Sequence, residues 1–278
     1  MERESLDFTS LSIITEIDVL GGNAHIHAFD GGVAIRTPDR PDYYWGNFLV
    51  MDGAPGAEDI ERWNAAFERE LPGLPHRTFT WDTTCAPDQL SWDTDGAGWE
   101  YSTERVLVGV PDDISTFHGS LPDGCTFEVL DPSDEYAWRS LIELAVATRP
   151  EMFAESAFRD HAESMYAARQ RDAEHGRSAS LAIRNSRGDV VASLGIAGCR
   201  HALARYQSVM TDPAYRRNGF ASFLLARAAE LAATSYGAAR LVIVCEAGSD
   251  AERLYTRAGF VARETVPSLE RTPDIHRA

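Results

Sequence analysis

The stretch Tyr215-Arg216-Arg217-Asn218-Gly219-Phe220-Ala221 decides the fold of the second half of the chain. It follows an apolar run that ends at Asp212-Pro213, and it precedes a run with helical spacing from Phe220 to Tyr236. This order predicts a strand, a turn rich in hydrogen-bond donors and the start of a helix. The free N–H groups and the positive dipole at a helix N-terminus attract anions. Because Gly219 permits close approach of the backbone and two arginines add charge, we expect a diphosphate site here.

The spacing Arg216-x-x-Gly219-x-Ala221 resembles the acyl-CoA-binding signature of the GNAT (Gcn5-related N-acetyltransferase) superfamily. A second segment, Leu254-Tyr255-Thr256-Arg257-Ala258-Gly259-Phe260, resembles the "LYxxxGF" segment of that family. Each motif alone would be weak, because short patterns with glycine recur by chance. Both together, separated by a helix and a strand, are fairly specific. The alternative interpretation is an ordinary strand-turn-helix with a glycine at a tight turn.

The chain has 278 residues, which exceeds a typical single domain and favours two domains. Its net charge of −17 is unevenly shared, since residues 1–124 hold 7 arginines against 23 acidic residues, whereas residues 125–278 hold 19 against 20. No basic face is evident, so we do not expect nucleic acid as a partner. A cationic amine would be attracted to such a protein, although the acidity can equally serve solubility alone.

Neither a membrane span nor a signal peptide is predicted, because no apolar stretch is long enough and the N-terminus lacks the basic-then-apolar pattern. The cysteines Cys85, Cys125, Cys199 and Cys245 are scattered, without the spacing of metal ligands. We therefore expect a cytoplasmic protein with unpaired thiols and no metal site.

The second half of the chain has the element order of the GNAT fold. Helices are predicted at 135–148 and 157–173, followed by strands at 181–183, 190–196 and 205–210, a helix from Phe220 that Gly237 ends, a strand at 241–244, and a short helix from Asp250 to Gly259. The resemblance covers about residues 126–266.

The first half repeats this order less clearly. Strands are predicted within 25–35, 43–51, 76–80 and 105–110, with a helix after Gly56 that carries Ile60, Trp63, Phe67 and Leu71 on one face and a short element at 90–99. The predicted fold class is therefore α/β (α+β), with two GNAT-like domains, each a mixed, mostly antiparallel sheet flanked by helices.

In this interpretation residues 1–124 form a degenerate GNAT-like domain, residues 125–278 form the catalytic domain, and the linker lies near Pro111–Gly124. The segment Tyr43–Leu71 would match Arg205–Leu231 of the second half. Its turn, Asp52–Asp59, holds three acidic residues and no arginine, and carboxylates there would repel a diphosphate. The first domain should therefore not bind CoA.

The resemblance implies an N-acetyltransferase that moves an acetyl group from acetyl-CoA to an amine of a small molecule or peptide, by direct attack in a ternary complex. In the family, pantetheine pairs with the backbone of the strand before the loop, and a main-chain N–H there can steady the oxyanion. The implied strand residues are Val209, Met210 and Thr211, and the implied pyrophosphate residues are Arg216, Arg217, Asn218, Gly219, Phe220, Ala221 and Ser222.

Tyr255 matches the family tyrosine that donates a proton to the leaving sulfur, although it could also be a packing residue beside Phe260. Many family members carry a catalytic glutamate on the strand before the turn, but Tyr206–Val209 has no carboxylate. Glu246 is our first candidate for the general base and His201 the second; water could also carry the proton. Where the family often has an asparagine that holds the cofactor, this chain has Gly248, which puts the finer cofactor contacts in doubt.

Two alternatives stay open from the sequence. One is a CoA-binding regulatory protein without turnover, which Gly248 and the missing strand glutamate would support. The other is a transferase for succinyl-CoA or malonyl-CoA, in which Arg200 or Arg205 would meet the second carboxylate. A homodimer is expected only because dimers are common in the family.

Overall fold

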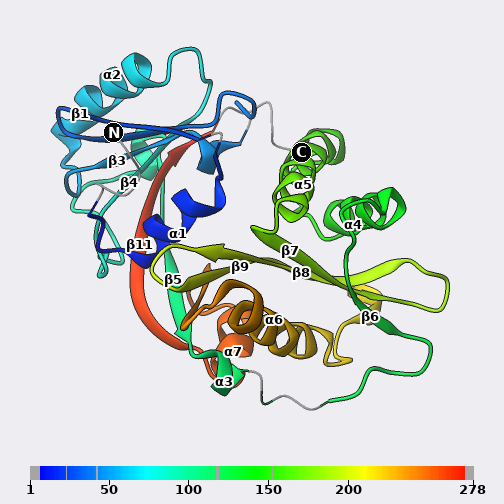
Figure 1. Cartoon of the computed structure of the whole chain (residues 1–278). Helices are drawn as coiled ribbons and strands as arrows, with labels where there is room; N and C mark the ends of the chain where they lie inside the picture. The colour runs from blue at the N-terminus through cyan, green and yellow to red at the C-terminus, as the bar shows by residue number, and fades with distance from the viewer. Residues whose placement is uncertain are drawn as a thin grey trace. The chain divides into compact units, whose positions relative to one another are not determined.

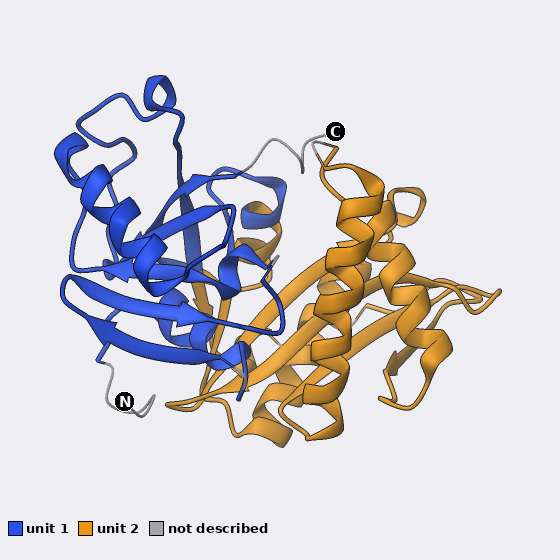
Figure 2. Ribbon diagram, turned by 90° about the horizontal axis from the view of Figure 1, so that it is seen from above, with its two compact units in different colours: residues 1–106, 244–252, 262–275 blue, residues 107–243, 253–261, 276–278 orange. Residues whose placement is uncertain are grey.

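The computed structural model describes residues 7–22, 24–41, 43–114, 116, 119–151 and 153–272. Its chain forms two compact units, which Figure 2 shows in different colours. Unit 1 comprises residues 1–106, 244–252 and 262–275, and unit 2 comprises residues 107–243, 253–261 and 276–278. The units interleave because the chain returns to unit 1 twice after residue 243. A division at residues 124 and 125 therefore stays a prediction.

In unit 2, a sheet of mostly antiparallel strands carries helices on both faces (Figure 1). Strands β6 (Thr126–Val129), β7 (Ser178–Arg184), β8 (Val190–Cys199) and β9 (Leu203–Thr211) pair antiparallel in this order, and β10 (Arg240–Glu246) begins parallel to β9. Helices α4 (Glu135–Ala147) and α5 (Glu155–Glu174) cover one face, and α6 (Phe220–Tyr236) covers the other.

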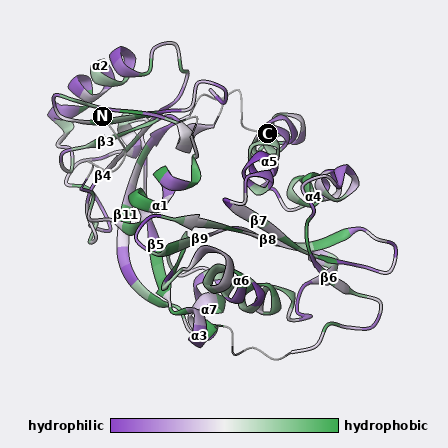
Figure 3. Cartoon of the chain, viewed as in Figure 1, coloured by the Kyte–Doolittle hydropathy of each residue, from purple (hydrophilic) through white to green (hydrophobic). Residues whose placement is uncertain are grey.

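The buried residues explain these elements. Strand β8 is buried from Val190 to Ala197, so it reads as a nearly continuous apolar run, which is typical of a strand covered on both faces. Helix α6 begins and ends where the sequence predicted, and Gly237 ends it in the left-handed conformation, with φ 61°. Figure 3 shows hydrophilic and apolar residues on both α4 and α5, and the buried ones, such as Leu141 of α4 and Tyr166 of α5, face the core.

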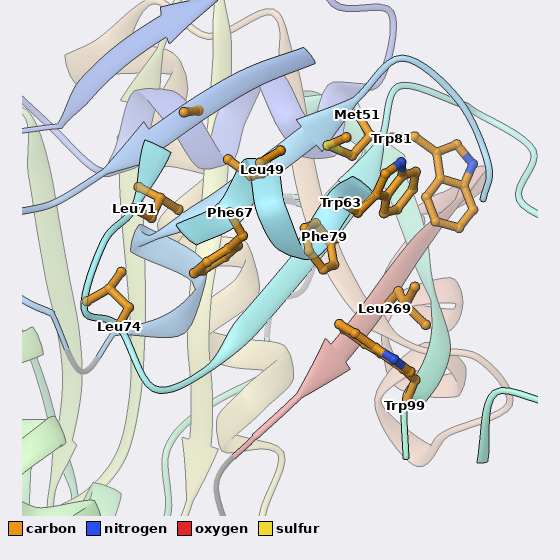
Figure 4. Close-up of a cluster of buried hydrophobic side chains, with 12 residues drawn as sticks. Leu49, Met51, Trp63, Phe67, Leu71, Leu74, Phe79, Trp81, Trp99 and Leu269 are labelled. Atoms are coloured by element: carbon orange, nitrogen blue, oxygen red, sulfur yellow. The ribbon is translucent and has the colours of Figure 1, made fainter. Parts of the chain in front are cut away.

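Unit 1 has strand order β1-β2-β3-β4-β11. Strands β1 (His25–Phe29), β2 (Gly32–Arg36) and β3 (Phe48–Met51) are antiparallel, α2 (Ile60–Glu70) follows a 3-10 turn at Ala57–Asp59, and β4 (Arg77–Trp81) is parallel to β3. Strand β11 (Val261–Arg271) pairs antiparallel with β4 through Leu269 and Phe79. Trp63 and Phe67 of α2 pack on Phe79 in the core that Figure 4 shows.

Both units thus contain a strand, a crossover helix and a parallel strand: β3–α2–β4 in unit 1 and β9–α6–β10 in unit 2. This repetition confirms the predicted fold class of mixed, mostly antiparallel sheets flanked by helices. The described residues contain no helix with the length and hydropathy needed to cross a membrane.

Several predicted elements need correction. The strand predicted at 43–51 starts only at Phe48, after a 3-10 turn at Tyr44–Gly46, because the Asn47 amide donates to the carbonyls of Arg40 and Tyr43 and fixes a turn. The element predicted at 90–99 is a 3-10 turn at Asp95–Ala97. The predicted linker opens with the short helix α3 (Pro111–Ile114), whose Ile114 is buried.

The remaining elements are β5 (Glu100–Gly109), a 3-10 turn at Pro213–Tyr215, α7 (Asp250–Arg257) and α1 (Leu11–Val19). The sequence predicted β5, although with a later start, and α7. It did not predict α1, β6 or β11.

Candidate functional site

Helix α6 begins without a side-chain cap. Its N-cap, Gly219, accepts the first intrahelical hydrogen bond from the N–H of Phe223 at 3.0 Å, and no side-chain oxygen caps the turn. The N–H groups of Phe220, Ala221 and Ser222 precede that bond and need partners from outside the helix. With the positive end of the helix dipole behind them, these three groups form a site for an anion.

The loop before α6 contains two residues in the left-handed conformation. Arg217 has φ 65° and Gly219 has φ 78°, both left-handed, whereas Arg216 is extended with φ −61° and ψ 159°. A turn with such residues can present several N–H groups to one anion, and we call residues 216–219 the nest. A left-handed arginine is a strained residue, and strain of this kind clusters at functional sites.

Several side-chain hydrogen bonds hold the loop. The Asn218 amide donates to the Tyr215 carbonyl at 2.9 Å, and the Asn185 amide of the β7–β8 hairpin lies 3.1 Å from the Tyr215 hydroxyl. The Asp212 carboxylate accepts a hydrogen bond from the N–H of Ala214 at 2.8 Å, so this acid already has a partner next to it in the sequence. Arg216 and Arg217 are exposed and leave two positive charges at the mouth of the nest.

Strand β9 opens towards this loop. Among the described residues, its parallel pairing with β10 covers Leu203–Arg205 only, although β9 continues to Thr211. On the other side, the register with β8 shifts between Ser193 and Gly195, and Ser208 has φ 46°. This is a β-bulge, which re-aims a strand and often lies beside an active site. Past the bulge, the half-buried residues are Val209, Met210 and Thr211.

Tyr255 lies in unit 2, near the end of α7, and is 6% exposed. Its ring is 6.3 Å from that of Phe260, which in turn meets Tyr206 of β9 edge-on at 5.5 Å. The Tyr206 hydroxyl donates to the Leu225 carbonyl of α6 at 3.0 Å, and burial raises the pKa of this phenol strongly. Ring packing thus connects Tyr255 to β9, and the Tyr206 hydroxyl connects β9 to α6; these two elements flank the loop. The catalytic role of Tyr255 stays a prediction.

The two candidates for the general base differ in position. Glu246 is exposed at the end of β10 and belongs to unit 1, so its approach to the loop in unit 2 stays a prediction. His201 lies in the turn between β8 and β9, at the start of β9. The loop follows the other end of that strand, about 25 Å away at 3.3 Å per residue. This position argues against His201.

Sequence reasoning missed two features of this site. The bulge at Ser208 has no sequence signal, because the left-handed position is not a glycine. Tyr166 of α5 is buried beside the bulge, where its hydroxyl lies 3.7 Å from the Met210 sulfur. Burial raises the pKa of Tyr166, against the opposing effects of Arg169 and the Ser208 hydroxyl. The sequence predicted a helix over 157–173, in which Tyr166 was not singled out.

The described part of the chain holds no group of three or more His, Cys, Asp or Glu side chains that could bind a metal ion. Residues 138–260, with the loop, the bulged strand and Tyr255, match the model of the Acetyltransferase (GNAT) family. Residues 138–260 are a GNAT domain. The predicted resemblance to this family is confirmed. The GNAT domain contains α5, the strands β8, β9 and β10, and the nest.

Solved structures resemble the chain over nearly its whole length. A conserved protein of unknown function from Staphylococcus epidermidis superposes with a TM-score of 0.71 at 15% identity, over 94% of this chain and 99% of the other. A GCN5-related N-acetyltransferase from Kribbella flavida gives 0.61 at 17% identity, over 96% and 97%. A tandem GNAT protein from the clavulanic acid biosynthesis pathway gives 0.56 at 14%, over 91% and 85%. At such identities the likeness concerns the fold, and no curated protein matched the sequence.

Proposed function

We propose that the chain is an N-acetyltransferase that transfers the acetyl group of acetyl-CoA to an amine of a small molecule or peptide. The observation that carries this proposal is the uncapped N-terminus of α6, behind a loop with two left-handed residues and two exposed arginines. The site fits a diphosphate because it supplies N–H donors and positive charge, and the acid that precedes the loop, Asp212, is already hydrogen-bonded.

The residues divide the work as follows. Residues Arg216–Ser222 would hold the pyrophosphate, and the backbone of Val209–Thr211 past the bulge would pair with the extended pantetheine arm. A neutral amine would then attack the thioester carbonyl directly within the ternary complex, with main-chain N–H groups of β9 steadying the oxyanion. Tyr255 would protonate the departing thiolate, and Glu246 would take the proton of the amine.

The charge of the chain supports a basic amine as acceptor. A net charge of −17 attracts cations over long range and disfavours nucleic acid as a partner. A cytoplasmic location and a homodimeric state are parts of the proposal that rest on cysteine usage and on the family, respectively.

Isothermal titration with acetyl-CoA tests the nest directly. Arg216→Glu replaces a positive charge at the mouth by a negative one, and we expect affinity to fall by roughly 30-fold or more, since each unit of charge near a phosphate contributes about 1 kcal/mol at the surface. The matched control is Arg240→Glu, since Arg240 is exposed at the start of β10, level with the start of β9. Equal affinity in the wild type and the Arg216→Glu variant would contradict the proposal.

Release of free CoA thiol with a panel of amines tests turnover. We expect Tyr255→Phe to lower kcat by about 100-fold, the usual contribution of a general acid, with the affinity for acetyl-CoA unchanged. Binding of acetyl-CoA without thiol release from any amine would favour the regulatory alternative, and release only from succinyl-CoA or malonyl-CoA would favour the other transferase.

A further inference from the structure

Helix α5 places an aromatic ring and an arginine over the bulge of β9. Tyr166 is 2% exposed, and its hydroxyl lies 3.7 Å from the Met210 sulfur. One turn later on α5, the Arg169 guanidinium lies over the Tyr166 ring, with 5.2 Å between its Cζ atom and the ring centroid. The Tyr166 ring is itself part of the apolar core that α4 and α5 form with the sheet.

The same guanidinium reaches the middle of the sheet. A Cβ atom placed on Gly195 of β8 would lie 3.7 Å from Arg169 Nη1 and 3.5 Å from Gln207 Cβ. Gly195 pairs with Gln207, and Gln207 directly precedes the bulged Ser208. The guanidinium and the Gln207 side chain therefore lie beside one point of the sheet. The bulged residue, Ser208, comes next along β9, and the residues that would hold the thioester, Val209–Thr211, follow it.

Arg169 differs from four other half-buried arginines of unit 2. Arg149, Arg159, Arg184 and Arg227 each pair with a carboxylate. Arg169 is also half-buried, yet within the described ranges its side chain has an aromatic ring as its partner rather than an acid. The chain carries 43 acidic residues against 26 basic ones, so acids are not in short supply.

A half-buried guanidinium without a carboxylate has lost part of its hydration and still has free N–H groups. Its planar fork matches a carboxylate through two parallel hydrogen bonds, and stacking on an aromatic ring holds the fork in one orientation. The Gln207 amide can add a further donor beside it. These properties describe a preformed subsite for a carboxylate.

We propose that Arg169, with Gln207, binds a carboxylate of the acceptor, so that the acceptor is an amino acid or a similar amine with a carboxylate close to the reacting nitrogen. The inference rests on the proposed function, which puts the thioester at Val209–Thr211. Simple polyamines would not use this subsite, although the charge of the chain attracts them. Arg169 is here a specificity-determining residue, and no proton passes through it.

Steady-state kinetics with paired acceptors tests the assignment. The probes are the common L-amino acids, each alongside its C-terminal amide, which keeps the amine and removes the carboxylate. With Arg169→Gln we expect kcat/KM for the carboxylate member of the best pair to fall by about 10- to 100-fold, through KM, as loss of a charge-assisted hydrogen bond predicts. The value for the amide should change by less than about 3-fold, and Arg169→Lys should recover part of the loss because it keeps the charge but not the fork.

The matched control is Arg159→Gln, which makes the same substitution on the same helix and removes an ion pair with Glu143. It should leave the ratio of acid to amide unchanged. A purely structural Arg169 would lower both members of a pair equally. That result, or a wild-type enzyme that prefers amides or polyamines, overturns the inference and leaves the proposed function standing.

The proposed function can also fail separately. If acetyl-CoA binds but no amine releases thiol, equilibrium titration of the same acids and amides into the CoA complex replaces kinetics. Binding of acids that Arg169→Gln weakens by the same 10- to 100-fold, with amides unaffected, sustains the subsite in a protein without turnover. Equal binding of acids by wild type and variant, or none, refutes it.

Discussion

Arg217 allows backbone strain to be separated from charge in the nest. It is held at φ 65°, where an L-residue other than glycine costs about 1–2 kcal/mol. Arg217→Gly removes that cost but lets the unfolded chain gain entropy worth about 0.5–1 kcal/mol. We therefore expect Arg217→Gly to be more stable than Arg217→Ala by about 0.5–1 kcal/mol, since alanine keeps the Cβ atom and the strain.

Both variants lose the same exposed charge. At about 4 Å from a phosphate in a medium like water, one unit of charge contributes about 1 kcal/mol, or roughly a 5-fold change in affinity. We expect acetyl-CoA to bind both variants about 5-fold more weakly than the wild type, and the difference to shrink in high salt because exposed charges are screened.

The assay must report on unit 2. Five of the six tryptophans lie in unit 1, so we choose hydrogen exchange of the buried amides of α6, from Leu224 to Ala232, over fluorescence. Isothermal titration gives the affinities. Slower α6 exchange in Arg217→Ala than in Arg217→Gly would refute the strain argument. A much larger loss of affinity in Arg217→Gly would show that the left-handed arginine also preorganises the nest.

Two further predictions concern unit 1, and tryptophan fluorescence during urea unfolding reports on both. Glu264→Ala should lower the free energy of unfolding by about 2–3 kcal/mol, because the Ser10 hydroxyl and the N–H of Leu11 lose their acceptor at the start of α1. The control, Glu61→Ala on the exposed face of α2, should change the free energy of unfolding little. An equal effect of the two substitutions would contradict the capping role of Glu264. Glu270→Gln should raise stability at pH 7 to 8, because burial, more than the charge of Glu100, raises the pKa of Glu270 above 4.5 and folding disfavours its ionised form. This gain in stability should disappear as the pH falls from the raised pKa of Glu270 to below 4.5, where Glu270 is protonated in both the folded and the unfolded wild type. A gain that does not depend on pH would contradict burial of the carboxylate as its cause.

The elements that the sequence predicted best have local signals at both ends. Gly219 and Gly237 bracket an apolar stripe, and α6 occupies the predicted range. Helix α1 was missed because Leu11–Val19 is rich in β-branched residues, which favour strands. Its first turn is held by two carboxylates, Asp82 and Glu264, that are distant in sequence. Strand β11 was missed for a related reason, since Leu269 pairs with Phe79, and a pairing over such a separation has no local signature.

The candidate site was predictable to a similar degree. The nest follows from glycine and arginine at fixed spacing, so its residues could be named from the sequence. The bulge at Ser208 and the stacking of Arg169 on Tyr166 depend on how α5 packs on the sheet. None of these three residues belongs to a motif, and the sequence predicted only the helix over 157–173 that carries Arg169 and Tyr166.

The repeated strand-helix-strand unit also explains why we assign the anion site to unit 2 alone. In unit 1, the Asp59 carboxylate accepts from the N–H of Gly56 at the start of the turn that leads into α2, and this bond, more than the pairing with Arg62, lowers the pKa of Asp59. A Cβ atom on Gly56 would lie 2.6 Å from a carboxylate oxygen of Glu58, so a second acid fills the space beside the backbone. Before α6, the helix start is uncapped and flanked by arginines. At the corresponding position before α2, two carboxylates already supply negative charge. A diphosphate would have to displace two carboxylates there, so we expect one CoA per chain.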